Sequence, residues 1–239
     1  MIPFKTVIDE RLMPSINKGL DYEKKLITHL HKHGLMSKRE KGAGASPVGH
    51  DFHLLNKTKG IAHPGKAYER ATGESKVSTH AAFGQMSVHY DHDAGKWGIH
   101  PKIRALKPEF ASAVDHATVG GKPLMDHVNQ TMGRPSKIAK PKGDIYSDKT
   151  DLSPVHAYLK DHHVDVLHVG THGTFRAGDR DATGVGFPKA KGEGSFRLRQ
   201  KGSNPAIKTI QFNVNKLEKS HINLENDEHL QHIKQVLGH

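Results

Sequence analysis

Two acidic residues and a lysine have types and spacings that suit metal-assisted chemistry on a phosphate ester. Asp51 follows a glycine-rich segment, and Glu74 and Lys76 are separated by one residue. Side chains alternate between the two faces of a strand, so Glu74 and Lys76 should share a face. Mg²⁺ prefers oxygen ligands, and a nearby lysine can orient water and offset charge on the phosphate. We therefore expect Asp51 and Glu74 to hold one or two Mg²⁺, which Mn²⁺ can replace, and Lys76 to assist the reaction.

A third acidic residue lies in a helix predicted over 21–33, which Gly34 should end. Glu23 falls at helical spacing from Leu26 and Leu30, so it should lie on the buried side of this helix. An unpaired buried carboxylate costs several kcal/mol, and it therefore calls for a cation or a metal-bound water as partner. The alternative is a glutamate at the edge of the apolar stripe that reaches solvent.

The elements that must position these residues are a helix, two strands and a second helix. After the helix, residues 37–50 are rich in glycine and are predicted to form a loop. Strands are predicted over 51–55 and 74–78, and a helix over 79–90. This order indicates a mixed α/β fold. Further along the chain, the pattern predicts helices near 108–115, 124–132, 154–162 and 226–236, and strands at 164–169, 195–200 and 209–214.

Composition divides the chain into three parts. Residues 1–132 should form the core that carries the acidic residues. Residues 133–150 are rich in Pro, Lys, Gly and Ser, which is typical of a linker or a long surface loop. Residues 151–239 should form a β-rich C-terminal extension that completes the sheet and contacts a polyanionic partner.

The order Glu23, Asp51, Glu74, Lys76, Gln85 resembles the PD-(D/E)xK, or restriction-endonuclease-like, superfamily. The core of that family runs helix, strand, strand, helix, with these residue types in this sequence. The resemblance covers roughly residues 21–90 and implies a restriction-endonuclease-like core with a mixed sheet. It also implies that Glu23, Asp51 and Glu74 bind the metal, that Lys76 is catalytic, and that Gln85 supports the site.

The match to the family has three departures. His50 stands where the family has proline, and the 22 residues between Asp51 and Glu74 require an inserted loop. Tyr90 lies five residues past Gln85, whereas the recombination-exonuclease branch has four. The resemblance therefore implies a metal-dependent DNA endonuclease of no particular branch. Many members act as dimers in which each subunit cuts one strand, so a homodimer fits the same expectation.

The charge of the chain favours nucleic acid as the partner. There are 36 Lys and Arg against 25 Asp and Glu, a formal net charge of +11. Such a surface attracts polyanions. No apolar run approaches the roughly 18–20 residues of a membrane span, so a membrane is not expected as a partner. The beginning of the chain does not read as a secretory signal, and we expect an intracellular protein of a bacterium or of a phage-infected host.

A basic segment in the second half is expected to bind DNA. Phe196 and Leu198 alternate with Arg197 and Arg199, so one face of this strand should pack while the other presents guanidinium groups to phosphates. Solvated surface charges are the alternative. Together with Lys201 and with Arg176, which follows the apolar strand at 164–169, these arginines are the predicted DNA contacts. The region is similar to C-terminal parts of phage-encoded restriction-like proteins.

Two other functional classes remain open. A basic DNA-binding or DNA-packaging module without catalysis would explain the charge but has no need for converging acids. A His-rich metal-binding protein would use some of the 21 histidines. We expect His29, His31 and His33 to spread around their helix and to make a poor metal trio, and we expect no helical histidine pair four residues apart to lie near a carboxylate.

Overall fold

The computed structural model describes residues 16–35, 37–39, 51–55, 74–79, 83–136, 143–200 and 204–239. The chain forms two compact units. The first unit consists of Met1–Ala81, His162–Ala190 and Leu217–His239; the second consists of Ala82–Asp161 and Lys191–Lys216. Both units are therefore discontinuous in sequence. These boundaries differ from the linear division into 1–132, 133–150 and 151–239, because the first unit closes only with strands and a helix from the second half of the chain.

The first unit contains a mixed five-stranded sheet in the order β1-β2-β3-β9-β10. The strands are β1 (Ser37–Arg39), β2 (Phe52–Leu55), β3 (Glu74–Ser78), β9 (Val166–Val169) and β10 (Gly173–Arg176). Neighbours are antiparallel except β3 and β9, which are parallel. The short helix η1 (Gly170–His172) joins β9 to β10. The C-terminal part of the chain thus completes the sheet, and β1 occupies the start of the predicted loop.

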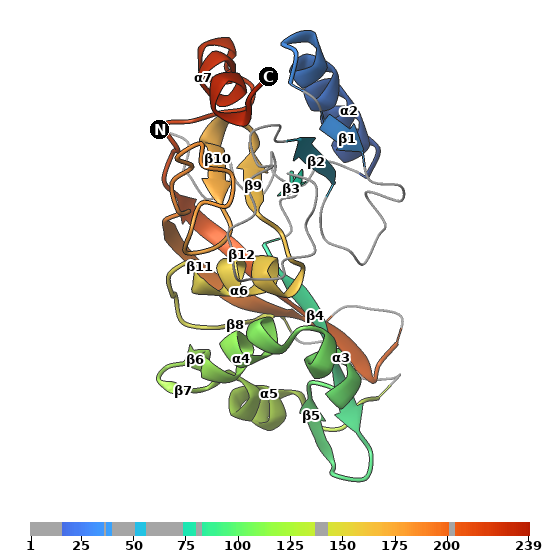
Figure 1. Ribbon diagram of the computed structural model, residues 1–239. Helices are drawn as coiled ribbons and strands as arrows, with labels where there is room; N and C mark the ends of the chain where they lie inside the picture. The colour runs from blue at the N-terminus through green and yellow to red at the C-terminus, as the bar shows by residue number, and fades with distance from the viewer. Residues whose placement is uncertain are drawn as a thin grey trace, which may run out of the picture. The chain divides into compact units, whose positions relative to one another are not determined.

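Two helices supply side chains to the core of this unit. They are α2 (Ile16–Lys32) and α7 (Asp227–Leu237), drawn in blue and red in Figure 1. The core contains buried apolar residues of both helices and of the sheet, among them Leu26, Leu30, Phe52, Leu54, Val77, Val166, Leu230, Ile233 and Leu237. The apolar face of β2 and β3 therefore packs in the same core as α2 and α7.

The predicted end of the first helix is confirmed. Gly34 has a φ of +76°, the left-handed conformation that glycine adopts without strain. The amide of Leu35 donates to the carbonyl of Leu30 at 2.9 Å, which closes the helix in the manner of a Schellman motif. The helix begins at Ile16, earlier than the predicted start at residue 21.

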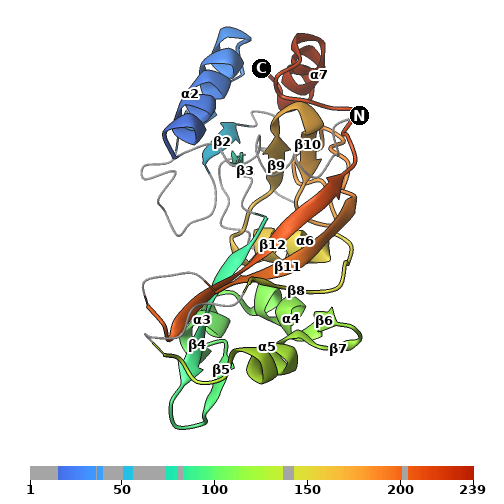
Figure 2. The same cartoon turned by 180° about the vertical axis from the view of Figure 1, so that it is seen from behind.

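The second unit is built on another five-stranded sheet, in the order β5-β4-β12-β11-β8. Its strands are β4 (Gln85–Asp91), β5 (Lys96–Gly98), β8 (Ile145–Tyr146), β11 (Gly192–Arg199) and β12 (Ile207–Leu217). Figure 2 shows β11 and β12 as long neighbouring strands. The small β-hairpin and the helices of this unit are β6 (Thr118–Val119), β7 (Lys122–Pro123), α3 (Pro101–Leu106), α4 (Pro108–His116), α5 (Leu124–Met132) and α6 (Ser153–Asp161).

Aromatic side chains join the helices of the second unit to its sheet. The ring of Phe110 in α4 lies 5.7 Å from that of Phe196 in β11 and 5.4 Å from that of Tyr158 in α6. The ring of Phe196 in turn lies 5.1 Å from that of Phe212 in β12. The predicted helices at 108–115, 124–132 and 154–162 are confirmed as α4, α5 and α6. In the described ranges no helix has the length and apolar character needed to cross a membrane.

The helix predicted over 79–90 is wrong for the part that the structure describes. Residues from Gln85 onward form β4, which pairs with β12 and β5. Met86 and Val88 are buried while Gln85 is exposed, an alternation with the period of a strand. The α/β class is confirmed, whereas the last helix of the expected helix–strand–strand–helix order is replaced by a strand of the second unit. The predicted linker at 133–150 likewise contributes β8 to the sheet of this unit.

Gly84 tests the packing of the second unit. It has a φ of +124°, and a Cβ at this position would lie 2.4 Å from Cε2 of Phe110. We expect Gly84→Ala to destabilise the protein by about 2 kcal/mol or more, through backbone strain and overpacking. Gly120→Ala is the matched control, because Gly120 also has a positive φ, +56°, but meets nothing within 4 Å. Urea unfolding followed by the fluorescence of Trp97, the single tryptophan and a residue of this unit, measures the difference. Equal losses for the two variants would contradict the proposed role of the contact with Phe110.

Candidate active site

The alternation of β2 and β3 separates apolar from polar side chains. Phe52, Leu54 and Val77 belong to the buried core. Asp51, His53, Glu74 and Lys76 occupy the alternate positions of the same two strands, so they share the opposite face of the sheet. Two predicted acids and the predicted lysine are thus brought to one surface.

The strand register fixes the spacing along this surface. His53 lies opposite Lys76, and Leu55 lies opposite Glu74. Asp51 precedes Phe52, the partner of Val77, and donates its amide hydrogen to the Val77 carbonyl at 2.8 Å. With a rise of about 3.4 Å per residue, Asp51 is displaced along the strands by roughly 7 Å from Lys76 and by roughly 14 Å from Glu74. Lys76 therefore lies between the two acids, which are too far apart to bind one Mg²⁺ directly at about 2.1 Å.

The carboxylate of Asp51 is held at the end of the β2–β3 pair. Its Oδ2 accepts hydrogen bonds from the amide of Thr79 at 2.6 Å and from the hydroxyl of Thr79 at 2.7 Å. The residue is 7% exposed. Both of these bonds use Oδ2, so neither occupies Oδ1. The sequence pattern predicts Thr79 as the first residue of the helix over 79–90 and assigns it no role in the site.

Glu74 is paired with a histidine that the sequence analysis also missed. Nδ1 of His53 lies 3.2 Å from Oε2 of Glu74, and the Glu74 side chain is 30% exposed. The strand period could have revealed His53, because it is two residues from Asp51 and must share its face. The strand register places this imidazole directly across from Lys76.

The backbone of Lys76 is fixed by a third acid, Asp165. The amide of Lys76 donates to Oδ2 of Asp165 at 2.8 Å, and the amide of Asp165 donates to the carbonyl of Lys76 at 2.9 Å. Asp165 precedes β9, the strand parallel to β3. Only the long-range pairing of β3 with β9 reveals it, since 88 residues separate Lys76 from Asp165 in sequence.

Glu23 and Gln85 are placed differently from the other predicted site residues. Glu23 is 2% exposed, so its predicted burial is confirmed. It lies on the same stripe of α2 as Leu26 and Leu30, which pack in the core with the apolar face of the sheet. The helix therefore directs it to the apolar side, away from the face of Asp51. Gln85 opens β4 in the second unit, where it is exposed.

The predicted DNA-binding residues fall on both units. Arg176 ends β10 in the first unit, Arg197 and Arg199 lie in β11 of the second, and Lys201 is outside the described residues. The predicted alternation of β11 is confirmed, with Phe196 and Leu198 buried.

Arg197 is engaged in an ion pair with Asp144. Nε of Arg197 lies 2.8 Å and Nη2 lies 2.6 Å from Oδ2 of Asp144. Burial by itself would raise the pKa of Asp144, but hydrogen bonds from Arg197 and from the amide of Gln200 outweigh burial and lower this pKa. Arg197 therefore has a structural role, whereas Arg199 is exposed and available to a phosphate.

His168, in β9, is part of the core. Its Nε2 lies 2.8 Å from the hydroxyl of Tyr22, and its Nδ1 lies 2.9 Å from the hydroxyl of Thr174. Burial lowers the pKa of His168 to about 3. The ring is therefore neutral at physiological pH, and both of its nitrogens are engaged by hydroxyl groups.

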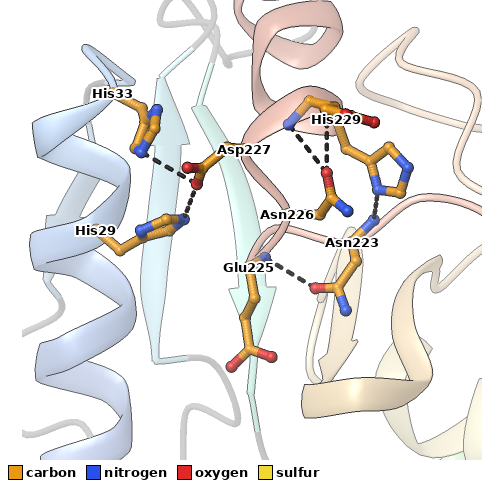
Figure 3. A network of polar contacts seen from close by, with 8 residues as sticks. His29, His33, Asn223, Glu225, Asn226, Asp227 and His229 are labelled. Carbon is orange, nitrogen blue, oxygen red and sulfur yellow. Dashed lines mark hydrogen bonds and ion pairs between the residues drawn. The ribbon is translucent and has the colours of Figure 1, made fainter.

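One expectation about the histidines of the first helix is wrong, because a pair four residues apart does lie near a carboxylate. His29 and His33 are four residues apart, so they share a face of α2. Their ring nitrogens and a carboxylate oxygen of Asp227 all lie within 4.8 Å of one another, the geometry of a potential metal site. Figure 3 shows both imidazoles directed at Asp227. His31 is exposed and is not part of this group.

The two arginines of β11 should respond differently to substitution. Arg197→Ala removes the partner of a mostly buried carboxylate, and we expect a loss of about 1–2 kcal/mol of stability after screening by solvent. The lowered pKa of Asp144 implies that this loss is largest near neutral pH and fades as acid protonates Asp144. Arg199→Ala should leave stability unchanged and weaken DNA binding with a smaller salt dependence. Urea unfolding and filter binding at several salt concentrations measure these effects; equal stability of the two variants would contradict the assignment.

Comparison with known proteins assigns no family to the chain. No known protein family, no curated protein and no solved structure matches it. The geometry that bears on function is therefore that of the chain's own residues, above all the polar face of β2 and β3.

Proposed function

We propose that this protein is a metal-dependent DNA endonuclease whose active site is the polar face of β2 and β3. The observation that carries the proposal is that Asp51, Glu74 and Lys76 lie on the same face of two paired strands whose other face packs in the core. A polar sheet face with two acids and a central lysine has no packing role that requires this composition. A DNA-binding module would not need the three residues together.

The residues have distinct roles in this proposal. Lys76, between the two acids, faces the scissile phosphate, orients the attacking water and offsets the negative charge that develops in the transition state. Asp165 and Thr79 are positioning residues: Asp165 fixes the backbone of Lys76, and Thr79 fixes the carboxylate of Asp51. The imidazole of His53 lies beside the carboxylate of Glu74.

The donor set fits Mg²⁺, with Mn²⁺ as a substitute. Asp51 and Glu74 offer the hard oxygen ligands that this cation takes, and their separation assigns each carboxylate its own ion or its own bound water. When bound, the cation would polarise the phosphoryl oxygen and activate water. Glu23 and Gln85, which the family resemblance placed in the site, have no role in this proposal because of their positions in α2 and β4.

Duplex DNA is the proposed substrate because the chain carries a formal net charge of +11. Arg199, which is exposed in β11, is a predicted contact that a phosphate can reach. A homodimer that cuts both strands, and activity inside a bacterial or phage-infected cell, belong to the same proposal.

Cleavage of supercoiled plasmid tests the proposal. We expect the wild type to nick or linearise the plasmid with Mg²⁺ or Mn²⁺ and not with EDTA. Lys76→Ala and Asp51→Asn should each lower the rate by about 10²–10³-fold, because each removes a group that acts on the transition state. Lys25→Ala, which removes an exposed lysine of the same unit, is the matched control and should cleave like the wild type.

The variants must also retain the wild-type affinity for the same DNA in a gel shift, because only then does a lower cleavage rate report on catalysis and not on binding. If the wild type binds the plasmid but cleaves it with neither cation, the non-catalytic binding module is the better description. The same follows if Lys76→Ala and Asp51→Asn cleave at the wild-type rate.

Thr79 provides a finer test of how the site is positioned. Thr79→Val removes the hydroxyl donor to Asp51 and keeps the shape of the side chain and the amide donor. We expect the cleavage rate to fall about 10–100-fold, as for other groups that orient a metal ligand. Thr79→Ser retains the hydroxyl and should keep most of the activity. If Thr79→Val cleaved DNA with the wild-type rate and Mg²⁺ dependence, the hydroxyl would have a structural role at the end of β3 and no role in positioning Asp51 for catalysis.

A further inference from the structure

We propose that His29, His33 and Asp227 form a binding site for one transition-metal ion of the Zn²⁺ class, which joins α2 to α7. The inference does not depend on the proposed nuclease function, because none of the three residues lies on the polar face of β2 and β3.

The distances between the three ligand atoms fit a tetrahedral ion. Nε2 of His33 lies 3.2 Å and Nε2 of His29 lies 3.5 Å from the same oxygen, Oδ1 of Asp227. Bonds of about 2.0–2.1 Å at tetrahedral angles place neighbouring ligand atoms about 3.3–3.4 Å apart. The carboxylate of Asp227 therefore stands from each imidazole at about the separation that a bound Zn²⁺ requires, and the two imidazole nitrogens lie within 4.8 Å of each other, which leaves a fourth position for water.

One of the ligand atoms is buried without a hydrogen bond. Nε2 of His29 is closed to solvent and makes no hydrogen bond with any described residue. Its 3.5 Å distance to Asp227 exceeds the usual range for an N–H···O bond. A buried polar atom of this kind is unfavourable. A shared ion would satisfy this nitrogen together with that of His33.

The backbone of Asp227 is held in place by the turn that begins α7. The side chain of Asn226 accepts hydrogen bonds from the amides of Glu228 and His229, at 2.9 and 3.1 Å, and so caps the helix. Nδ1 of His229 accepts from the amide of Asn223 at 3.1 Å (Figure 3). Asp227, as the first residue of α7, is thereby fixed opposite α2 before any ion binds, which lowers the entropic cost of forming the site.

The ligand chemistry selects the kind of ion. Neutral imidazole nitrogens suit Zn²⁺, Co²⁺ and Ni²⁺, whereas Mg²⁺ takes oxygen ligands. The Asp227 side chain is 69% exposed, so an ion can enter from solvent and keep a bound water. Because the ligands come from a helix near each end of the chain, the ion would cross-link α2 and α7 over the core that they share.

Titration of the full-length protein with Zn²⁺ after chelator treatment tests the site. The variants are His29→Gln, His33→Gln and Asp227→Asn; His31→Gln, an exposed histidine of the same helix, is the matched control. Calorimetry should give one fewer tight Zn²⁺ equivalent for each of the three variants, or an affinity at least about tenfold weaker. His31→Gln should bind like the wild type. Co²⁺ should give the intense visible absorption of a tetrahedral complex in the wild type and in the control.

Thermal unfolding separates loss of the ligand from loss of the fold. With EDTA, Asp227→Asn should melt close to the wild type; Zn²⁺ should raise the melting temperature of the wild type and of His31→Gln but not that of Asp227→Asn. Mg²⁺ should not reproduce the shift. Zn²⁺ stoichiometry, affinity and stabilisation that are the same in His33→Gln and Asp227→Asn as in the wild type would overturn the site.

Discussion

The packing of one apolar sheet face in the core with two helices is the constraint on which the first unit depends. Phe52, Leu54 and Val77 can be buried in the core shared with α2 and α7 only if the alternate residues of β2 and β3 face the other way. A register slip of one residue would exchange the two sets and turn the acids toward the apolar core. The same packing lays α2 and α7 over a common core, where His29 and His33 approach Asp227. Both proposed sites are therefore consequences of how this one sheet is covered.

The sequence predicts those parts of the fold that depend on local periodicity. The strand over 74–78 and the helix over 124–132 lie at the predicted positions, because apolar spacing and flanking turn residues decide them locally. The helix over 79–90 fails for a related reason: Met86 and Val88 alternate with polar residues, and this period of two, with Gly95 in the following turn, indicates a hairpin. The sequence does not predict that the two units are discontinuous, because only the parallel pairing of β3 with β9 reveals it.

The candidate site likewise contains residues whose positions follow from local sequence and residues that only the tertiary structure reveals. Asp51, Glu74 and Lys76 were predictable because spacing within strands determines which face each residue occupies. Asp165, by contrast, reaches Lys76 through the pairing of strands distant in sequence. Arg197 is a second example. Strand alternation predicts that its guanidinium lies on the polar face of β11, but only the structure reveals the ion pair with Asp144. Local pattern thus predicts the direction of a side chain, and tertiary structure determines its partner.

Ligand chemistry makes the two proposed metal sites independent of each other. The polar sheet face offers carboxylate oxygens on either side of Lys76. The positive charge of this lysine disfavours a metal ion close to it unless an anion such as a phosphate also binds. The α2–α7 site offers two imidazoles and one carboxylate without a lysine among its ligands, so it can bind an ion in the absence of nucleic acid. A hard cation bound with substrate would then govern catalysis, while a softer one would govern the packing of two helices that lie far apart in sequence. Under these two proposals, metal dependence of cleavage and metal dependence of stability would be separate properties, carried by different residues of the same unit.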